Sequence, residues 1–254
     1  MVKIAVGCIQ MRSGVDVAAN VAAAEALIRQ AAGAGARLIA TPEMTSLLDR
    51  TPGAVAAKAR AEGDDEALAA FRRLARELEA TLLIGSLPIQ AEGGKCFNRS
   101  YLLAPDGSVA ARYDKIHMFD VQLGGGEAIR ESDTFAPGQH AVIASAEGAR
   151  LGLAICYDVR FPHLFRDLAR AGAEVIALPS AFTRITGEAH WRTLLKARAI
   201  ETGAFIIAPA QGGRHEDGRE TYGRSLVVGP WGQIVGELPH AEPGLLTATL
   251  DLDE

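Results

Sequence analysis

Short hydrophobic runs alternate along the chain with segments in which hydrophobic residues recur every three or four positions. The continuous runs predict buried strands, and the spaced segments predict helices with one apolar face. The chain is therefore expected to fold as an α/β protein. In the first half, the pattern predicts strands at 4–10, 37–41 and 82–85, and helices at 17–31 and 68–78.

The pattern changes at residue 98, where one extended segment leads through a turn into another. The turn is Ala104-Pro105-Asp106-Gly107, a sequence typical of a β-hairpin connection. Alternation then resumes, and it predicts strands at 151–155, 175–178, 205–208, 225–228, 233–235 and 245–250, with helices at 162–171 and 188–201. Two halves of similar make-up predict two mixed sheets with outer helices, stacked as a four-layer α-β-β-α sandwich. We expect residues 1–254 to form a single domain.

Composition and charge exclude several classes of protein. Hydrophobic residues make up 48% of the chain and charged residues 22%, which excludes a disordered, collagenous or coiled-coil protein. The formal net charge is −5 and no Lys/Arg-rich block occurs, so nucleic acid is not an expected partner. No run approaches the roughly 18 apolar residues of a membrane-spanning helix, and the N-terminal segment lacks the apolar core of a signal peptide. A cytoplasmic protein without a membrane partner is expected.

One cysteine stands out by its position. Cys8, Cys96 and Cys156 are too few and too widely spaced for a disulfide framework or a thiolate zinc site, and no metal is expected. Cys156 ends the hydrophobic run 151–155, and a helix is predicted a few residues later, which is the arrangement of a nucleophile on a sharp strand-to-helix turn. A lone cysteine is more often a small buried hydrophobe, and Cys8 and Cys96 keep that interpretation.

Two further side chains offer the chemistry that a nucleophilic thiol requires. No histidine is placed convincingly to take its proton, whereas Glu43 follows a buried strand at the sheet edge where α/β proteins bind ligands. Lys115 lies in the extended segment 113–120, where it would stabilise an oxyanion. Taken singly, Glu43 has the alternative interpretation of a solvated loop acid, and Lys115 that of a charge on a strand edge.

With Glu43, Lys115 and Cys156 in this order, the sequence resembles the nitrilase superfamily of carbon–nitrogen hydrolases, whose members have a Glu-Lys-Cys catalytic triad. Glu43 stands in TPEM, Lys115 in YDKIHMFD and Cys156 in ICYDVRFP. The resemblance covers nearly the whole chain, because the opening strand, the hairpin at 98–101 and the closing segment with Pro-Trp-Gly at 230–232 fit it as well. It implies an amidase that needs no metal or organic cofactor.

The resemblance also implies roles for individual residues. Glu43 would take the proton of Cys156, and the thiolate would attack the amide carbonyl to give a thioester. Lys115 and a backbone N–H near Tyr157 would hold the oxyanion. A second glutamate, implied by the resemblance and expected to orient Lys115, falls on Glu131.

One loop departs from the superfamily pattern. Related amidases tend to carry Pro-Gly after the FDV-like stretch, whereas this chain has Leu123-Gly124-Gly125-Gly126. Glu127 follows this run and has the interpretation of a surface acid. Glycines give a loop conformational freedom, so a substrate contact of this loop is left open.

The resemblance further implies a homodimer, with the helices at 160–171 and 193–202 as candidate interface elements. A member that acts only as a binding or scaffold protein is an alternative from another class. Such a protein would tolerate loss of Glu43, Lys115 or Cys156, and all three are present.

The second half of the chain indicates which amide is cleaved. The segments 179–191 and 195–202 resemble omega-amidases and deaminated glutathione amidases, and Gln-Gly-Gly-Arg-His at 211–215 resembles the second of these branches. Deaminated glutathione is therefore the expected small-molecule substrate. The alternative is an omega-amidase acting on α-ketoglutaramate, and a carbamoyl-amino-acid hydrolase or a nitrilase is less favoured.

Both keto-acid amides carry a carboxylate, so an arginine is expected near the thiol. Arg160 is the first candidate and Arg184 the second. The expected substrate-binding residues are Tyr157, Arg160, Ser180, Phe182, Thr183 and His215. Of these, His215 is expected to contact the peptide portion of a longer substrate. Arg198 and Glu201, three positions apart on one predicted helix, are expected to form a structural ion pair.

Overall fold

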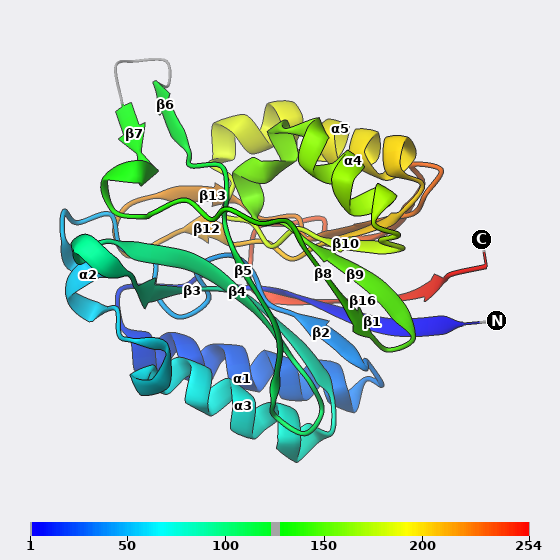
Figure 1. The fold of residues 1–254 in the computed structure, drawn as a ribbon, viewed down its shortest axis with the longest axis horizontal. Coiled ribbons are helices and arrows are strands. Elements are labelled where there is room, and N and C mark those ends of the chain that lie inside the picture. Colours follow the sequence, from blue (N-terminus) through cyan, green and yellow to red (C-terminus); the bar gives the residue numbers. More distant parts are fainter. Residues whose placement is uncertain (1, 123–127, 254) are drawn as a thin grey trace.

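Two six-stranded sheets stack on each other at the centre of the molecule (Figure 1). The structure is a computed structural model, and it describes residues 2–122 and 128–253. The first sheet has the order β16-β1-β2-β3-β4-β5, and the second has the order β15-β14-β11-β10-β9-β8. The three central strands β1, β2 and β3 run parallel, as do β9, β10 and β11, and the flanking strands are antiparallel. Both sheets are therefore mixed, as predicted.

The elements of each sheet come from one half of the chain, apart from the last strand. The first sheet comprises β1 (Lys3–Gln10), β2 (Leu38–Ala40), β3 (Thr81–Gln90), β4 (Cys96–Leu103), β5 (Val109–Asp114) and β16 (Gly244–Asp251). The second comprises β8 (Val142–Ala146), β9 (Ala149–Leu153), β10 (Val175–Ala177), β11 (Phe205–Ala208), β14 (Leu226–Val228) and β15 (Ile234–Glu237).

Helices cover the outer faces of both sheets. The first sheet is covered by α1 (Val17–Gly33) and α3 (Glu66–Leu78), and the second by α4 (Pro162–Arg170) and α5 (Arg184–Thr202) (Figure 1). The four-layer α-β-β-α sandwich is therefore confirmed.

Shorter elements form the connections. They are α2 (Ala54–Lys58), the 3-10 turns η1 (Glu62–Asp64), η2 (Glu92–Gly94), η3 (Glu131–Asp133) and η4 (Cys156–Arg160), and two ribbons, β6 (Asp120–Gln122) with β7 (Ala128–Arg130) and β12 (Gly212–Arg214) with β13 (Glu220–Tyr222).

Side-chain alternation along β1 explains the layers. Val6 and Cys8 pack in the core between the two sheets. Ile9 points to the other face, where it packs with Ile28 of α1 and Phe71 of α3. Because both faces of the central strands are covered, these strands appear in the sequence as continuous hydrophobic runs.

Capping residues decide where the helices begin. In α3, the Asp65 carboxylate accepts a hydrogen bond from the Leu68 N–H at 2.7 Å. In α5, Thr183 is the cap and accepts from the Thr186 N–H at 3.3 Å, so the helix begins at Arg184 rather than at the predicted residue 188. In the first turn of α5, Arg184 and Ile185 are exposed and the buried residue is Gly187, so hydrophobic spacing misses this turn.

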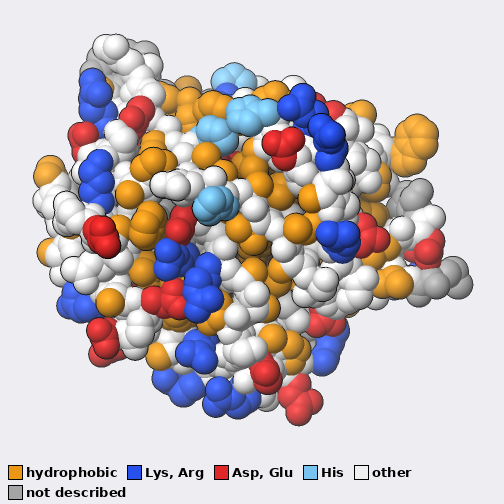
Figure 2. Space-filling view, in the orientation of Figure 1, with side chains coloured by type: hydrophobic (Ala, Val, Ile, Leu, Met, Phe, Trp, Pro, Cys, Tyr) orange, Lys and Arg blue, Asp and Glu red, His pale blue; other side chains and the backbone are white. Residues whose placement is uncertain are grey.

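The described surface mixes charges of both signs. In Figure 2, Lys and Arg side chains are interspersed with Asp and Glu, and the described residues of the face shown form no continuous basic surface. Within residues 2–122 and 128–253, no helix combines the length and apolar character that crossing a membrane requires.

Candidate active site

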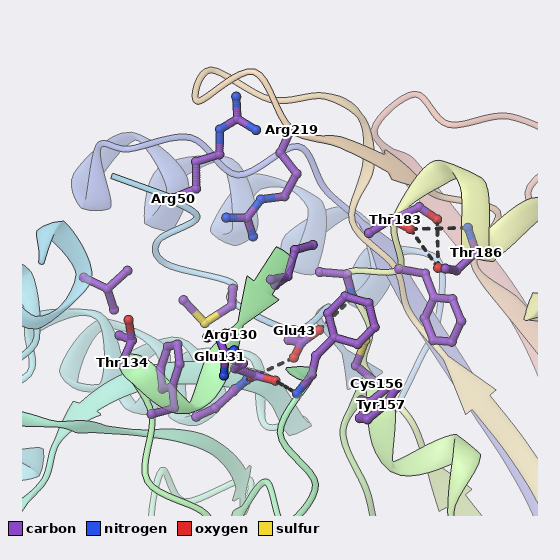
Figure 3. A pocket seen from close by; sticks show the side chains of 18 of the residues that line it. Glu43, Arg50, Arg130, Glu131, Thr134, Cys156, Tyr157, Thr183, Thr186 and Arg219 are labelled. Atoms are coloured by element: carbon purple, nitrogen blue, oxygen red, sulfur yellow. Dashed lines mark hydrogen bonds between the residues drawn. The ribbon is translucent and has the colours of Figure 1, made fainter. Parts of the chain in front are cut away.

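A pocket of about 600 Å³ opens beyond the carboxyl ends of β2, β9 and β10. This volume is typical of a small-molecule site. Loops that follow parallel strands meet at this edge of a sheet, and Figure 3 shows the side chains gathered there. Glu43, Lys115, Glu131 and Cys156 all line the pocket, although they lie far apart in the sequence.

Cys156 is the first residue of η4, in a strained turn that follows β9. Its backbone φ is +46°, in the left-handed region that residues other than glycine rarely adopt. The Cys156 N–H donates to the Pro179 carbonyl at 3.0 Å, and the Asp158 carboxylate accepts from the Ile155 N–H at 2.8 Å. These bonds hold the turn in place while the Cys156 side chain reaches the pocket (Figure 3).

Lys115 lies between two carboxylates. Its Nζ donates to Glu43 Oε1 at 2.8 Å and to both carboxylate oxygens of Glu131 at 2.9 Å. The side chains of Lys115 and Glu43 are only 2% and 5% exposed. Burial alone would lower the pKa of Lys115, but the charges of Glu131 and Glu43 outweigh it and hold this pKa well above its ordinary value. Lys115 is therefore a fixed cation.

Asn98 of β4 completes this group. It begins the hairpin segment 98–101 that the resemblance covers, but no role was predicted for it. Its Nδ2 donates to Glu43 Oε1 at 2.9 Å and to Glu131 Oε1 at 3.1 Å. Oε1 of Glu43 thus accepts from both Lys115 and Asn98, whereas Oε2 accepts from the Ala181 N–H at 2.9 Å. Asn98 is 1% exposed, and within the described chain its Oδ1 has no hydrogen-bond donor. The amide is oriented entirely by the two carboxylates.

The surroundings of Cys156 favour the protonated thiol over the thiolate. Burial raises its pKa well above the ordinary value, and the charge of Glu43 adds to this effect. Lys115 and the Ala181 N–H lower the pKa but do not cancel the first two influences. A carboxylate and a neutral thiol therefore stand together, which is the arrangement for proton transfer from sulfur to Glu43.

A second buried network lies behind the turn. Asp158 is 0% exposed, and its oxygens contact the Tyr113 hydroxyl at 2.7 Å and Nδ1 of His117 at 2.6 Å. The His117 ring stacks on Phe161 with 3.6 Å between centroids. His117 is therefore linked to the turn of Cys156 through the Asp158 carboxylate. The carboxylate that acts on the Cys156 thiol itself is that of Glu43.

Four of the predicted substrate-binding residues line the pocket, namely Tyr157, Arg160, Phe182 and Thr183. The Arg160 guanidinium lies over the rings of Tyr157 and Phe182, 5.8 and 5.7 Å from their centroids, and contacts Nδ1 of His190 at 3.2 Å. No carboxylate of the described residues pairs with it. Its charge therefore faces a site that can accept an anionic group.

Ser180 and His215 do not line the pocket, in contrast to the prediction. Ser180 is 0% exposed, and its hydroxyl donates to the Leu178 carbonyl at 3.0 Å. His215 is 3% exposed, with Nδ1 2.8 Å from the Ser13 carbonyl and Nε2 2.6 Å from Oγ1 of Thr221. Internal hydrogen bonds occupy both side chains, so their contribution is to hold the surrounding loops.

Three arginines that no local pattern marked also line the pocket: Arg50, Arg130 and Arg219. The expected ion pair on α5 is present, with 2.7 Å between Arg198 and Glu201. The glycine run at 123–126 and Glu127 lie outside the described residues. In the described part of the chain, no three His, Cys, Asp or Glu side chains are grouped so that they could hold a metal ion.

Comparison with known proteins gives matches along almost the whole chain. A family model described as carbon-nitrogen hydrolase matches residues 5–254. A deaminated glutathione amidase of Synechocystis sp. is 40% identical over 250 residues, which are 96% of this chain and 90% of the relative. Proteins of the same name from Yersinia enterocolitica and Homo sapiens are 42% and 39% identical, and the matches cover 94% and 96% of this chain and 84% and 76% of the relatives.

Solved structures share the fold. The Caenorhabditis elegans NitFhit protein has a TM-score of 0.91 at 33% identity, and the match covers 99% of this chain but 61% of that longer one. A mutant of the amidase from Nesterenkonia sp. AN1 has a TM-score of 0.86 at 30% identity, with 98% and 91% of the two chains covered. That neighbour carries the acetamide moiety of fluoroacetamide, added covalently at its active-site cysteine.

Proposed function

Since the chain belongs to the carbon–nitrogen hydrolase family and is an amidase, we propose that it cleaves the amide bond of a small keto acid through a thioester on Cys156. One observation carries this proposal. Glu43, Lys115 and Glu131 form a single buried, hydrogen-bonded group in the wall of the pocket that Cys156 also lines. A carboxylate beside a thiol supplies a base, and a fixed ammonium supplies a counter-charge for an oxyanion.

In the first half-reaction, Sγ of Cys156 forms a bond to the amide carbonyl carbon while its proton passes to Glu43. The raised pKa of the thiol couples these two events, because a free thiolate is disfavoured before substrate arrives. The carbonyl oxygen takes the electron pair and is held by Lys115 and the Tyr157 N–H. The carbon–nitrogen bond then breaks, Glu43 returns the proton to the leaving nitrogen, and the amine departs.

In the second half-reaction, water attacks the thioester. Glu43 accepts a proton from the water, and Lys115 again faces the oxyanion. The carbon–sulfur bond breaks, the proton returns to Cys156, and the carboxylic acid leaves. Whenever Glu43 carries a proton, Glu131 remains as the negative partner of Lys115, so the cation is never left unpaired in the buried site. These steps use water and groups of the chain itself.

The charge of the pocket supports an anionic substrate. Its described lining carries six Lys or Arg side chains and four carboxylates, in a chain whose net charge is −5. Arg160, next to the nucleophile turn, is suited to bind the carboxylate of a keto acid. Together with the names of the relatives, this supports deaminated glutathione as the substrate, and α-ketoglutaramate is the competing one.

The test is kcat/KM for deaminated glutathione and for α-ketoglutaramate with the same enzyme preparation, because the ratio reports differential binding of the two transition states. A Cys156→Ala variant provides the blank for contaminating amidases. A ratio of about ten or more in favour of deaminated glutathione, equivalent to about 1.4 kcal/mol, supports the proposal. Preference for α-ketoglutaramate makes the enzyme an omega-amidase, and hydrolysis of neither substrate above the blank overturns the proposal.

We also propose that the chain is one domain that acts in the cytoplasm as a homodimer. The candidate interface is formed by α4 and the C-terminal part of α5, where Ile200 is 58% exposed. Sedimentation at micromolar protein tests the dimer, since a mass near the 26.8 kDa of one chain contradicts it. Fractionation of the producing cells tests the location, and recovery outside the cytoplasmic fraction contradicts that part.

A further inference from the structure

On the basis of the proposed function, we propose that His190 of α5 is a positioning residue that orients the Arg160 guanidinium toward the carboxylate on the acyl side of the substrate. The preference of the enzyme for keto-acid amides then depends on both residues. Arg160 supplies the positive charge, and His190 fixes the direction in which that charge is presented.

The contact between the two side chains has a defined direction. Nη2 of Arg160 lies 3.2 Å from Nδ1 of His190. A guanidinium has N–H donors and no acceptor, so Nδ1 of His190 is the acceptor and the ring proton is on Nε2. The neutral ring of His190 is therefore the form that holds Arg160, and it does so without the negative charge that would neutralise the guanidinium.

Two aromatic rings hold the guanidinium of Arg160 from other directions. It lies 5.8 Å from the ring centroid of Tyr157 and 5.7 Å from that of Phe182, where a cation is attracted to the ring face. The Phe182 ring packs edge-to-face on Trp191 with 5.0 Å between centroids. Trp191 is 1% exposed, and its Nε1 donates to a backbone carbonyl at 2.9 Å. Because His190 directly precedes Trp191, one turn of α5 fixes both the Phe182 ring and the acceptor.

The helix α5 also holds the turn that carries Arg160. Arg198, about two turns further along α5 than His190, is 6% exposed and donates from Nε to the Val159 carbonyl at 2.8 Å. Val159 lies in η4 between Cys156 and Arg160. The helix thus contacts the nucleophile turn through the backbone of one residue and the side chain of the next. His190 is therefore held in register with the nucleophile.

The guanidinium keeps donors for a substrate carboxylate. Within residues 2–122 and 128–253, His190 is the one hydrogen-bond partner of the Arg160 side chain. A guanidinium has five N–H groups in a planar fork that matches a carboxylate, so a two-pronged contact remains available. Arg160 lines the pocket and His190 does not. His190 therefore acts on the substrate through Arg160.

The test compares each proposed substrate with an analogue that has a methyl ketone in place of the keto acid. The pairs are α-ketoglutaramate with levulinamide, and deaminated glutathione with levulinoyl-cysteinylglycine. Within each pair the leaving amine is the same, and the acyl groups of the two pairs are identical, so either pair reports the effect of the acyl carboxylate. We expect wild-type kcat/KM to be about 10- to 100-fold higher for the keto acid, as for a charge-assisted contact.

Three variants isolate the role of His190. His190→Ala should lower the ratio of keto acid to methyl ketone about three- to tenfold, the effect of one lost hydrogen bond, and the change should appear in KM for the keto acid. His190→Asn should restore most of the ratio, because its Oδ1 replaces Nδ1 as the acceptor. His140→Ala is the matched control, since His140 is exposed and lies outside the pocket lining. It should keep the wild-type ratio.

Coupling between the two residues gives a second readout. Arg160→Gln should bring the ratio of keto acid to methyl ketone close to one. Adding His190→Ala to this variant should change the ratio no further, because the guanidinium that His190 orients is absent. A His190→Ala effect of the same size in both backgrounds would show that the residues act independently, and would overturn the proposal.

Failure of the positioning role and failure of the proposed function give different results. A wild-type ratio in His190→Ala overturns the positioning role, and so does an equal loss of kcat/KM on keto acid and methyl ketone, because that is the result of a structural role. A wild-type enzyme that hydrolyses keto acid and methyl ketone alike overturns the role of Arg160 as well, and leaves the amidase mechanism standing. Absence of hydrolysis of both proposed substrates by wild type, relative to Cys156→Ala, overturns the proposed function itself.

Discussion

Nδ1 of His117 lies 2.6 Å from Oδ1 of Asp158, and this contact joins the segment of Lys115 to the turn of Cys156. Asp158 also accepts from the His117 N–H at 3.1 Å and from the Ile155 N–H at 2.8 Å. A fully buried carboxylate is costly unless it is paired and hydrogen-bonded. The segments that bear the cation and the nucleophile are therefore positioned as one unit.

Replacing Asp158 should separate these segments. Asp158→Asn removes the negative charge and directs an NH₂ group at neighbours that donate hydrogen bonds. We expect kcat to fall about 10- to 100-fold with KM nearly unchanged, since a displacement of the nucleophile by about 1 Å has an effect of this size. Asp167→Asn, at a side chain that is 57% exposed on α4, is the control. Wild-type kcat in a folded Asp158→Asn variant would contradict the positioning role.

Lys115→Ala should abolish most of the turnover. It removes the proposed oxyanion partner, and loss of one such donor lowers rates by about 10² to 10³. The measurement is steady-state kcat on α-ketoglutaramate, with the exposed Lys196→Ala of α5 as the control. Near-wild-type turnover of Lys115→Ala would disprove the role given to this side chain.

Two substitutions at Asn98 distinguish electrostatics from packing. Asn98→Ala removes the donor that Glu43 and Glu131 share, and should lower kcat/KM about tenfold. Asn98→Asp keeps the size but sets a third carboxylate against the other two, and should lower kcat/KM by about 100-fold or more. Gln90→Glu, at the exposed end of neighbouring β3, is the matched amide-to-acid control. Equal losses in the two Asn98 variants would argue against the electrostatic account.

Alkylation should report the resting state of the nucleophile. Because the pKa of Cys156 is raised, its thiolate fraction at neutral pH is smaller than that of a free cysteine, and it grows as the pH rises. At neutral pH, we expect iodoacetamide to react with the substrate-free enzyme more slowly than with a cysteine peptide. The rate of reaction with the enzyme should increase as the pH is raised. Cys156→Ala gives the background from Cys8 and Cys96. A rate above that of the peptide at neutral pH would show a preformed thiolate.

Gly85 of β3 should not tolerate a side chain. An added Cβ would lie 2.1 Å from the Thr41 carbonyl oxygen and 2.3 Å from that of Pro42, so the segment leading to Glu43 would have to move. We expect Gly85→Ala to lower the free energy of unfolding by about 1 to 3 kcal/mol, measured by urea denaturation, and to reduce activity. In the control Gly63→Ala, the new Cβ meets nothing within 4 Å. Equal stability of the two variants would contradict this expectation.

The residues that local patterns could place are those at the ends of strands. Glu43 and Cys156 follow buried hydrophobic runs, and the topology of an α/β sheet brings such ends together. Lys115 follows the hairpin strand β5. Runs and turns therefore predict that these side chains lie at one edge of the sheets, whereas their assignment as a Glu-Lys-Cys triad depends on the resemblance to the nitrilase superfamily.

The remaining site residues depend on contacts between distant segments. Asn98 bonds to a glutamate 55 positions away, and nothing in its own strand indicates that partner. His215 was expected at the substrate because its surroundings resemble a branch of the superfamily, yet its ring contacts Ser13, 202 positions away. Arg219 is one of 26 Lys and Arg residues, and only the folded structure shows that its side chain lines the pocket.

The protonated state of Cys156 has a consequence for the life of the enzyme between turnovers. Oxidants such as peroxide attack thiolates, and so do most soft metal ions. Because burial and the charge of Glu43 raise the pKa of Cys156, the substrate-free enzyme presents little thiolate to either kind of reagent. The thiol therefore resists oxidation and metal binding while the pocket is empty, and it becomes reactive when the substrate binds.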